Sequence, residues 1–129
     1  MTARPMSLGK RRILVVDDEP GIRTLFSFML GAKGYDVRTA GSGEEALESI
    51  RGGPFDLVFL DIRMPAMDGL GALRALKALR PDIPVVMMTG YAVEQLLNEA
   101  MREGASGYLR KPFTVDELLG SIDRVLQPA

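Results

Sequence analysis

The feature that most constrains the fold is an alternation of two hydrophobic periods along the chain. Short apolar or alternating runs, typical of strands, cover residues 13–16, 35–40, 55–60, 84–89 and 108–110. Apolar residues recur at helical spacing after each run, over 22–30, 42–50, 70–79, 93–101 and 114–125. Five strands that alternate with five helices predict an α/β protein, in which helices cover both faces of a parallel sheet.

The composition of the strands also predicts their order. The runs 13–16, 55–60 and 84–89 are apolar almost throughout, as strands covered on both faces are. The runs 35–40 and 108–110 contain charged residues, so we place them at the edges. The result is a doubly wound (βα)5 sheet of order 2-1-3-4-5, the flavodoxin-like arrangement. In this arrangement ligands bind beyond the carboxyl ends of the first and third strands.

Short signals indicate where the helices begin. Pro20 suits a first helical turn. Ser42 with Glu45, and Thr114 with Glu117, have the spacing of capping boxes. The predicted apolar stripes of the first and fourth helices are Ile22, Leu25, Phe26, Met29 and Leu30, and Val93, Leu96, Leu97, Ala100 and Met101.

Three carboxylates converge in this topology. Asp17 and Asp18 follow the first strand and Asp61 follows the third. Each like-charge pair costs on the order of 4 kcal/mol at ~4 Å and an effective dielectric of ~20, so a cluster of three favours a bound cation. Mg²⁺ fits, because it takes a few carboxylates and keeps sites for phosphate oxygens. The alternative is that each residue is a loop acid or a helix cap, which for Asp18 alone is an equal choice.

The absence of two residue types narrows the chemistry. The chain has no His and no Cys. This excludes a His/Cys zinc site, a Ser–His or Cys–His nucleophile pair and a disulfide framework. A metal must therefore be a hard cation held by oxygen, and any phosphohistidine must come from a partner protein.

Two further polar groups reach the same edge of the predicted sheet. Thr89 ends the fourth strand and Lys111 follows the fifth. A hydroxyl and an ammonium beside Asp61 would neutralise phosphoryl oxygens while the carboxylate attacks, which indicates a phosphoryl-transfer site. Taken singly, Thr89 is better explained as a strand-end hydroxyl and Lys111 as a surface charge, so the prediction depends on their joint placement.

The segments around these residues resemble one known family. From Arg12 to about Leu126 the chain contains, in order, "VVDDEP", "LDIRMPAMDG", "MMTGYA" and "GYLRKPF". This combination and spacing resemble the receiver domain of two-component response regulators. The resemblance implies that Asp61 is the phosphoacceptor. It also implies that Asp17, Asp18, Asp61 and the backbone carbonyl of Arg63 bind Mg²⁺.

The resemblance further implies roles for the remaining motif residues. Thr89 and Lys111 would bind the phosphoryl group, Thr89 and Tyr108 would form a switch, and the Lys111–Pro112 bond would be cis. The switching face would be the fourth helix, fifth strand and fifth helix, roughly residues 93–126. Arg63 and Tyr91 flank the entry to the phosphoryl group. Their bulky side chains either slow the loss of the phosphoryl group or simply lie in solvent.

The same resemblance implies the partners. A histidine kinase or histidine phosphotransfer protein would donate the phosphoryl group, and a downstream protein would read the changed face. A dimer that forms on phosphorylation is a further option. Such a domain is not an enzyme, because it catalyses only its own phosphoryl transfer and dephosphorylation.

Three alternatives remain at this level. A phosphatase of the haloacid dehalogenase type also uses an Asp nucleophile with Mg²⁺, Thr and Lys. However, its nucleophile ends the first strand in a D-x-D pattern, whereas this chain has the adjacent pair Asp17-Asp18. The receiver itself is either free-standing or a fragment of a longer transcription regulator. The segment "GSGEEA", residues 41–46, resembles a dinucleotide fingerprint, but it follows a predicted edge strand and a capping box explains it.

Charge and hydropathy set the remaining expectations. A length of 129 residues fits one domain, with residues 1–10 as a flexible tail and 11–127 as the receiver. The net charge of −1 argues for neither a nucleic-acid nor an anionic-membrane partner. The basic run from Lys10 to Arg12 has too few charges for a nucleic-acid patch, so we expect no direct nucleic-acid binding. No apolar run reaches the length of a membrane span, and the N-terminus lacks the apolar core of a signal peptide, so we expect a cytoplasmic protein.

Overall fold

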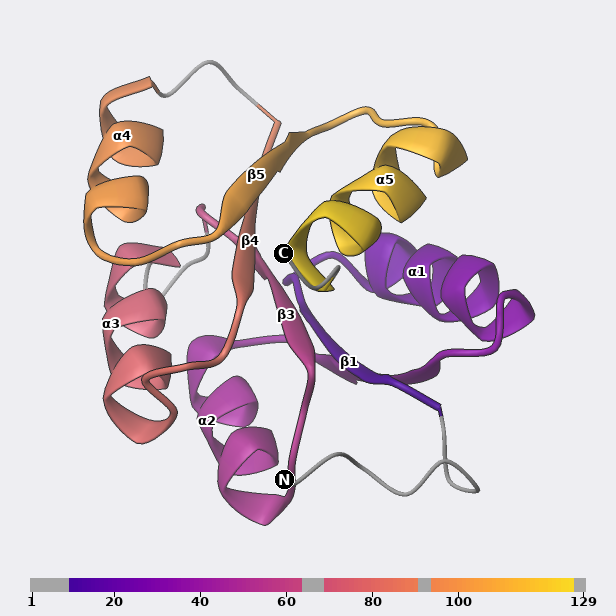
Figure 1. Ribbon diagram of the computed structural model, residues 1–129, viewed down its shortest axis with the longest axis horizontal. Coiled ribbons are helices and arrows are strands. Elements are labelled where there is room, and N and C mark those ends of the chain that lie inside the picture. The colour runs from indigo at the N-terminus through magenta and orange to yellow at the C-terminus, as the bar shows by residue number, and fades with distance from the viewer. Residues whose placement is uncertain (1–9, 64–68, 91–93, 127–129) are drawn as a thin grey trace.

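The computed structural model describes residues 10–63, 69–90 and 94–126. Its strands are β1 (Arg12–Val16), β2 (Asp36–Ala40), β3 (Leu57–Asp61), β4 (Val85–Thr89) and β5 (Gly107–Arg110). They form one parallel sheet in the order β2-β1-β3-β4-β5, which confirms the predicted topology (Figure 1). Residues 1–9 and 127 lie outside the described residues, so the flexible tail and the domain limits stay predictions.

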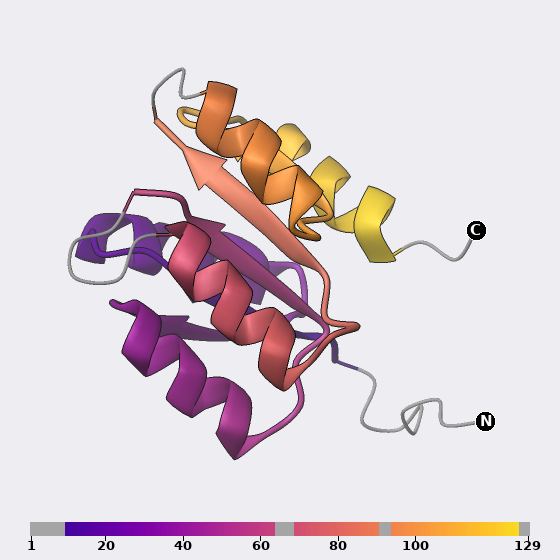
Figure 2. The ribbon, with the colours of Figure 1, turned by 90° about the vertical axis from the view of Figure 1, so that its left-hand side faces the viewer.

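Five helices cover the sheet on its two faces. They are α1 (Pro20–Ala32), α2 (Gly43–Gly52), α3 (Gly69–Leu79), α4 (Glu94–Arg102) and α5 (Val115–Leu126). Helices α1 and α5 lie on one face, and α2, α3 and α4 lie on the other (Figures 1 and 2). Each face has its own apolar core, one built around Phe26 and Phe59 and the other around Leu60 and Leu73.

Burial along the strands follows the predicted positions in the sheet. Every residue of β3 and β4 is buried, and β1 is buried from Ile13 to Val16. The edge strands β2 and β5 each have one buried residue, Ala40 and Leu109. Central strands covered by helices on both faces leave their polar residues only at their ends, which is where the carboxylates stand.

One of the two predicted capping boxes is complete. At α5 the Thr114 hydroxyl accepts the Glu117 N–H at 3.0 Å, and the Glu117 carboxylate accepts the Thr114 N–H at 2.8 Å. At α2 the Ser42 hydroxyl accepts the Glu45 N–H at 3.1 Å as predicted. The Glu45 carboxylate, however, accepts the N–H of Gly41 at 2.7 Å, one residue earlier than a capping box requires.

The predicted apolar stripes were partly wrong. Leu25 is 45% exposed, Leu96 36% and Met101 41%, whereas Phe26 and Leu97 are buried. Consecutive helical residues point about 100° apart, so a helix that buries Phe26 turns Leu25 away from the sheet. Val93 lies outside the described residues. The third strand also starts and ends later than predicted, so that Asp61 is its last residue and pairs with Met88 in β4.

Candidate functional site

The chain leaves β1 through a turn of carboxylates at the carboxyl end of the sheet. Asp17 is fully buried, and its N–H donates to the Ala40 carbonyl at 3.0 Å, which extends the pairing with β2. Its Oδ1 accepts the N–H of Glu19 at 2.9 Å. Asp18, the next residue, is exposed. The turn thus holds one carboxylate inside the protein and presents the next one to solvent.

Asp61 occupies the equivalent place at the end of β3. It is buried, and its Oδ1 accepts the Arg63 N–H at 3.0 Å. Close packing by α3 holds this backbone, because the Gly69 N–H donates to the Ile62 carbonyl at 3.1 Å. A Cβ at Gly69 would lie 2.3 Å from the Ile62 Cα and 2.7 Å from the Asp61 carbonyl oxygen. Glycine is therefore required where α3 begins against the strand that carries Asp61.

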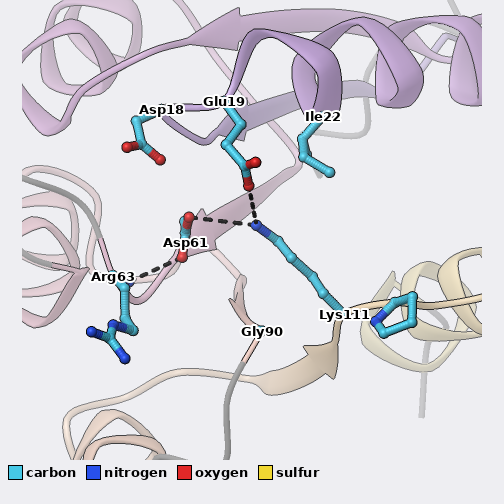
Figure 3. Close-up of a pocket in the computed structure, with 8 residues that line it drawn as sticks. Asp18, Glu19, Ile22, Asp61, Arg63, Gly90 and Lys111 are labelled. Carbon is cyan, nitrogen blue, oxygen red and sulfur yellow. Dashed lines mark hydrogen bonds and ion pairs between the residues drawn. The ribbon is translucent and has the colours of Figure 1, made fainter.

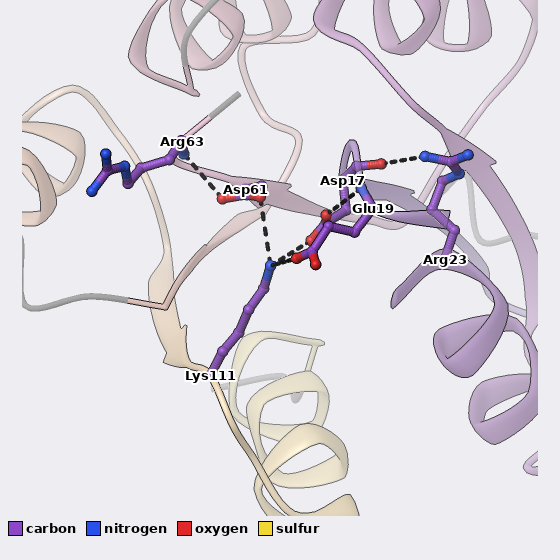
Figure 4. A network of polar contacts seen from close by, with 6 residues as sticks. All are labelled: Asp17, Glu19, Arg23, Asp61, Arg63 and Lys111. Carbon is purple, nitrogen blue, oxygen red and sulfur yellow. Dashed lines mark hydrogen bonds and ion pairs between the residues drawn. The ribbon is translucent and has the colours of Figure 1, made fainter. Parts of the chain in front are cut away.

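Lys111 brings a positive charge into this group of carboxylates (Figures 3 and 4). Its Nζ lies 2.6 Å from Asp17 Oδ2, 3.5 Å from Asp61 Oδ2 and 3.7 Å from Glu19 Oε1. Its backbone N–H donates to the Thr89 carbonyl at 2.7 Å, so the end of β4 positions it. The Lys111–Pro112 bond is cis, as the resemblance implies.

The charges and the burial act against each other at this site. Burial raises the pKa of Asp61, although the hydrogen bond from Arg63 and the charge of Lys111 oppose that rise. For Lys111, burial lowers the pKa, but the hydrogen bond to Asp17 and the charges of Asp61 and Glu19 outweigh it and the pKa is raised. The site therefore favours the protonated form of Lys111, whereas burial disfavours the ionised form of Asp61.

The two predicted switch residues lie in different surroundings. Thr89 ends β4 and is buried, one residue beyond the β4 partner of Asp61. Tyr108 is 47% exposed. The Arg110 guanidinium lies 5.4 Å from the centre of the Tyr108 ring. Thr89 thus ends the strand next to the one that carries Asp61, whereas Tyr108 lies on the edge strand β5. Tyr91 lies outside the described residues.

The carboxylates have a spacing that suits a small hard cation. Within the described residues, one ligand oxygen each from Asp17, Asp18 and Asp61 lie within 4.8 Å of one another. Opposite ligands of an octahedral Mg²⁺ with bonds of about 2.1 Å are about 4.2 Å apart, so small side-chain movements bring these oxygens onto one ion. The donor set is oxygen only, which fits Mg²⁺. Arg63 stands at the rim of this site, and its carbonyl as a ligand stays a prediction.

A cleft of about 620 Å³ opens over the site. Its described lining residues are Asp18, Glu19, Ile22, Asp61, Arg63, Gly90, Lys111 and Pro112. The sequence did not assign Glu19, Ile22, Gly90 or Pro112 to the site. Adjacency to Asp18 and Lys111 could have identified Glu19 and Pro112. Ile22 lines the cleft because of how α1 is rotated about its own axis, which hydrophobic periodicity alone does not determine.

Comparison with known proteins places the chain in a family. The family model described as the response regulator receiver domain matches residues 13–123. The chain belongs to the response regulator receiver family. The match confirms the family that the sequence motifs resemble. The comparisons give no support to the phosphatase alternative.

Relatives of this receiver domain occur in proteins of different length. The chain is 44% identical over 114 residues to the transcriptional regulatory protein ZraR of Escherichia coli (strain K12), covering 88% of this chain and 26% of ZraR. It is 35% identical over 115 residues to sporulation initiation phosphotransferase F of Bacillus subtilis (strain 168), covering 89% of this chain and 93% of that protein. The chain thus spans about a quarter of the length of ZraR.

Solved structures agree with the fold of the receiver domain. The chemotaxis protein CheY4 of Vibrio cholerae superposes with a TM-score of 0.86 at 34% identity, covering 91% of this chain and 99% of that one.

Among the described residues, no helix has the length and apolar character needed to cross a membrane.

Proposed function

We propose that this receiver domain accepts a phosphoryl group on Asp61 from a phosphohistidine of a histidine kinase or histidine phosphotransfer protein. The observation that carries the proposal is the convergence of Asp61 with Lys111, Asp17 and Asp18 at one end of the sheet. The chain has no His of its own, so the phosphohistidine belongs to the partner.

The two oxygens of Asp61 have separate tasks in this proposal. Oδ1 accepts the Arg63 N–H at 3.0 Å, and Oδ2 lies 3.5 Å from the Lys111 ammonium. A lone pair of Oδ2 forms the new bond to phosphorus while the P–N bond breaks, and its electrons return to the donor imidazole. The fixed backbone of Asp61 and Gly69 holds the nucleophile in place, so attack needs little reorganisation.

Thr89 and Lys111 would stabilise the transferred group. The Thr89 hydroxyl donates a hydrogen bond and the Lys111 ammonium a charge-assisted one to the phosphoryl oxygens. Lys111 lies nearer to Asp17 than to Asp61. Arrival of an anionic phosphoryl group would therefore draw it from Asp17 toward Asp61.

Asp17, Asp18, Asp61 and the Arg63 carbonyl would hold Mg²⁺. When bound, this ion supplies positive charge that offsets the repulsion between the Asp61 carboxylate and the phosphoryl oxygens. The burial of Asp17 and Asp61 beside a third carboxylate supports this assignment, because such a cluster is unfavourable without a cation.

The α4-β5-α5 face would carry the output to a downstream protein, with Thr89 and Tyr108 as the switch. The domain would perform one transfer and its own dephosphorylation without turnover on an outside substrate, and it would not bind nucleic acid directly. Relatives support both contexts, a longer transcriptional regulator and a short single-domain protein. Dimerisation on phosphorylation and a cytoplasmic location stay predictions.

Intact-mass spectrometry tests the transfer. Wild-type protein treated with a small acyl phosphate and Mg²⁺ is expected to gain one acid-labile phosphoryl group, and none when a chelator replaces Mg²⁺. Asp61→Asn is expected to gain none under either condition, with exposed Asp123→Asn as the control for lost charge. Full labelling of Asp61→Asn, or repeated turnover on a phosphate ester, would refute the proposal.

A further inference from the structure

Arg23 reaches from α1 to the backbone of the acidic turn. Its Nη1 donates to the carbonyl oxygen of Asp17 at 2.7 Å. Figure 4 shows the guanidinium approaching the turn from the side opposite Lys111. The Asp17 carbonyl belongs to the peptide group that joins Asp17 to Asp18. A short bond to this oxygen fixes the plane of that peptide, because the peptide group is rigid.

The glycine-rich segment "GSGEEA" supplies the other side of the Arg23 seat. A Cβ at Gly41 would lie 3.1 Å from Nη1 and 3.4 Å from Cζ of Arg23. Gly41 does not adopt a positive φ, so its small size rather than its conformation matters here. The Glu45 carboxylate accepts the Gly41 N–H, and its Oε1 would lie 3.3 Å from a Cβ at Gly41. Gly41 therefore leaves room for the guanidinium next to a carboxylate.

The two aspartates of the turn depend on different supports. The Asp17 carboxylate is buried and accepts hydrogen bonds from the Glu19 N–H and from Lys111. Asp18 is exposed, so packing does not fix its direction. Its Cα follows directly on the peptide group that Arg23 holds. The direction of the Asp18 carboxylate therefore depends on that peptide more than the direction of Asp17 does.

We infer that Arg23, seated against Gly41, is a positioning residue for the Mg²⁺ site. It holds the Asp17–Asp18 peptide so that the Asp18 carboxylate faces Asp61. This inference rests on the proposed Mg²⁺ site. A positioning role and a pure charge effect predict opposite results for Arg23→Gln. Loss of a nearby positive charge would by itself strengthen cation binding, whereas loss of the positioning contact weakens it.

Calorimetric titration of Mg²⁺ into the unphosphorylated protein measures the effect. Arg23→Gln is expected to weaken Mg²⁺ binding about tenfold, the usual effect of removing a group that orients a metal ligand. Arg23→Lys keeps one donor and is expected to recover part of this loss. The matched control is Arg80→Gln, which removes an arginine bond of 2.8 Å to the Ile50 carbonyl away from the site. It is expected to bind Mg²⁺ as the wild type does.

Gly41→Ala gives an independent approach to the same contact. The added methyl group would lie 3.1 Å from Arg23 Nη1, so the guanidinium has to shift by a few tenths of an ångström, and this variant is expected to weaken Mg²⁺ binding less than Arg23→Gln does. The double variant Arg23→Gln/Gly41→Ala is expected to bind no more weakly than Arg23→Gln alone, because both changes remove one interaction. Wild-type affinity in Arg23→Gln, tighter binding in it, or additive losses in the double variant would overturn the inference.

A measurement without metal separates this inference from the proposed function. In Mg²⁺-free protein, Arg23→Gln is expected to lower the backbone order parameters of Asp18 and Glu19 from about 0.85 toward about 0.6, and Arg80→Gln to leave them unchanged. Unchanged order parameters in Arg23→Gln would contradict the positioning role even if Mg²⁺ binds. Asp18→Asn with wild-type Mg²⁺ affinity would instead contradict the proposed metal site.

Discussion

Asp61 is a carboxylate whose ionised form the fold disfavours. Burial raises its pKa, and Asp17 adds to that rise, while the Arg63 N–H and Lys111 only partly offset it. In the proposed phosphoryl transfer this would favour reaction, because an ionised carboxylate held in a partly dry site would attack phosphorus without first shedding a full hydration shell.

The raised pKa of Asp61 predicts how stability depends on pH. The folded protein binds this proton more tightly than the unfolded chain does. The contribution of Asp61 is therefore most favourable below its unfolded pKa of about 4 and is lost as the pH rises through the folded pKa. In Mg²⁺-free buffer at pH 7, Asp61→Asn should be more stable than wild type, because the neutral amide removes the cost of a buried ionised carboxylate.

Urea unfolding from pH 7 down to pH 4 checks this prediction. The stability difference between wild type and Asp61→Asn should shrink as the pH falls. Exposed Asp123→Asn, which loses the same charge, should show no such trend. A less stable Asp61→Asn protein at pH 7, or a difference that does not change with pH, would contradict the account.

Single residues also show what the sequence could and could not predict. Asp17, Asp61, Thr89 and Lys111 were found because strand ends in a parallel sheet share one edge, so their positions follow from the topology. The contact from Arg23 to the Asp17 carbonyl could not be predicted in this way. It depends on the rotation of α1 and on the space beside Gly41, which spacing along the chain does not determine.

At the scale of elements, β5 and α4 are joined on the outside of the molecule. Arg110 Nη2 donates to both oxygens of Glu94 at 2.8 Å, which links the end of β5 to the start of α4. The same guanidinium lies over the exposed ring of Tyr108. An inward turn of this ring would therefore also disturb the contact between β5 and α4.

Thr89 is expected to couple the site to this face. A phosphoryl mimic on Asp61 draws the Thr89 hydroxyl toward it, and the vacated space favours the inward position of Tyr108. A coupling free energy of ~1–3 kcal/mol between the phosphoryl mimic and the inward position of Tyr108 gives a partial to strong shift in the population of that position. Amide chemical shifts in wild type should change as far as α4 and Tyr108, whereas in Thr89→Ala the changes should stay near Asp61.

The control for this mapping is Thr39→Ala, which removes an exposed threonine of β2 and should leave the wild-type pattern intact. Shift changes confined to the neighbours of Asp61 in the wild type, or identical maps for wild type and Thr89→Ala, would count against the coupling.

Element prediction from the sequence succeeded in number and order and failed in rotation. The periodicity located α1 and α4, but it assigned Leu25 and Leu96 to the buried stripes although both are exposed. Apolar residues adjacent in sequence fit two neighbouring helical faces. Only packing on the sheet decides between them. The capping box at α2 was similarly half right, since Glu45 bonds Gly41 rather than Ser42.

At the scale of the whole molecule, strand order builds the site. β1 and β3 are neighbours although α1, β2 and α2 separate them in sequence, and this brings Asp61 beside Asp17 and Asp18. The last residue of β4, Thr89, and the first residue after β5, Lys111, are added at the same edge. The two helical layers bury both faces of the sheet, so the cleft at the carboxyl ends of the strands gives a donor access to Asp61 (Figure 3).

The central claim is that Asp61, among these clustered carboxylates, takes the phosphoryl group. Its most direct test is to label the wild-type protein with a small acyl phosphate and Mg²⁺, digest it and locate the modified residue by tandem mass spectrometry. We predict one modified residue, Asp61, in the peptide that contains the end of β3. A phosphoryl group found instead on Asp17 or Asp18 would contradict it.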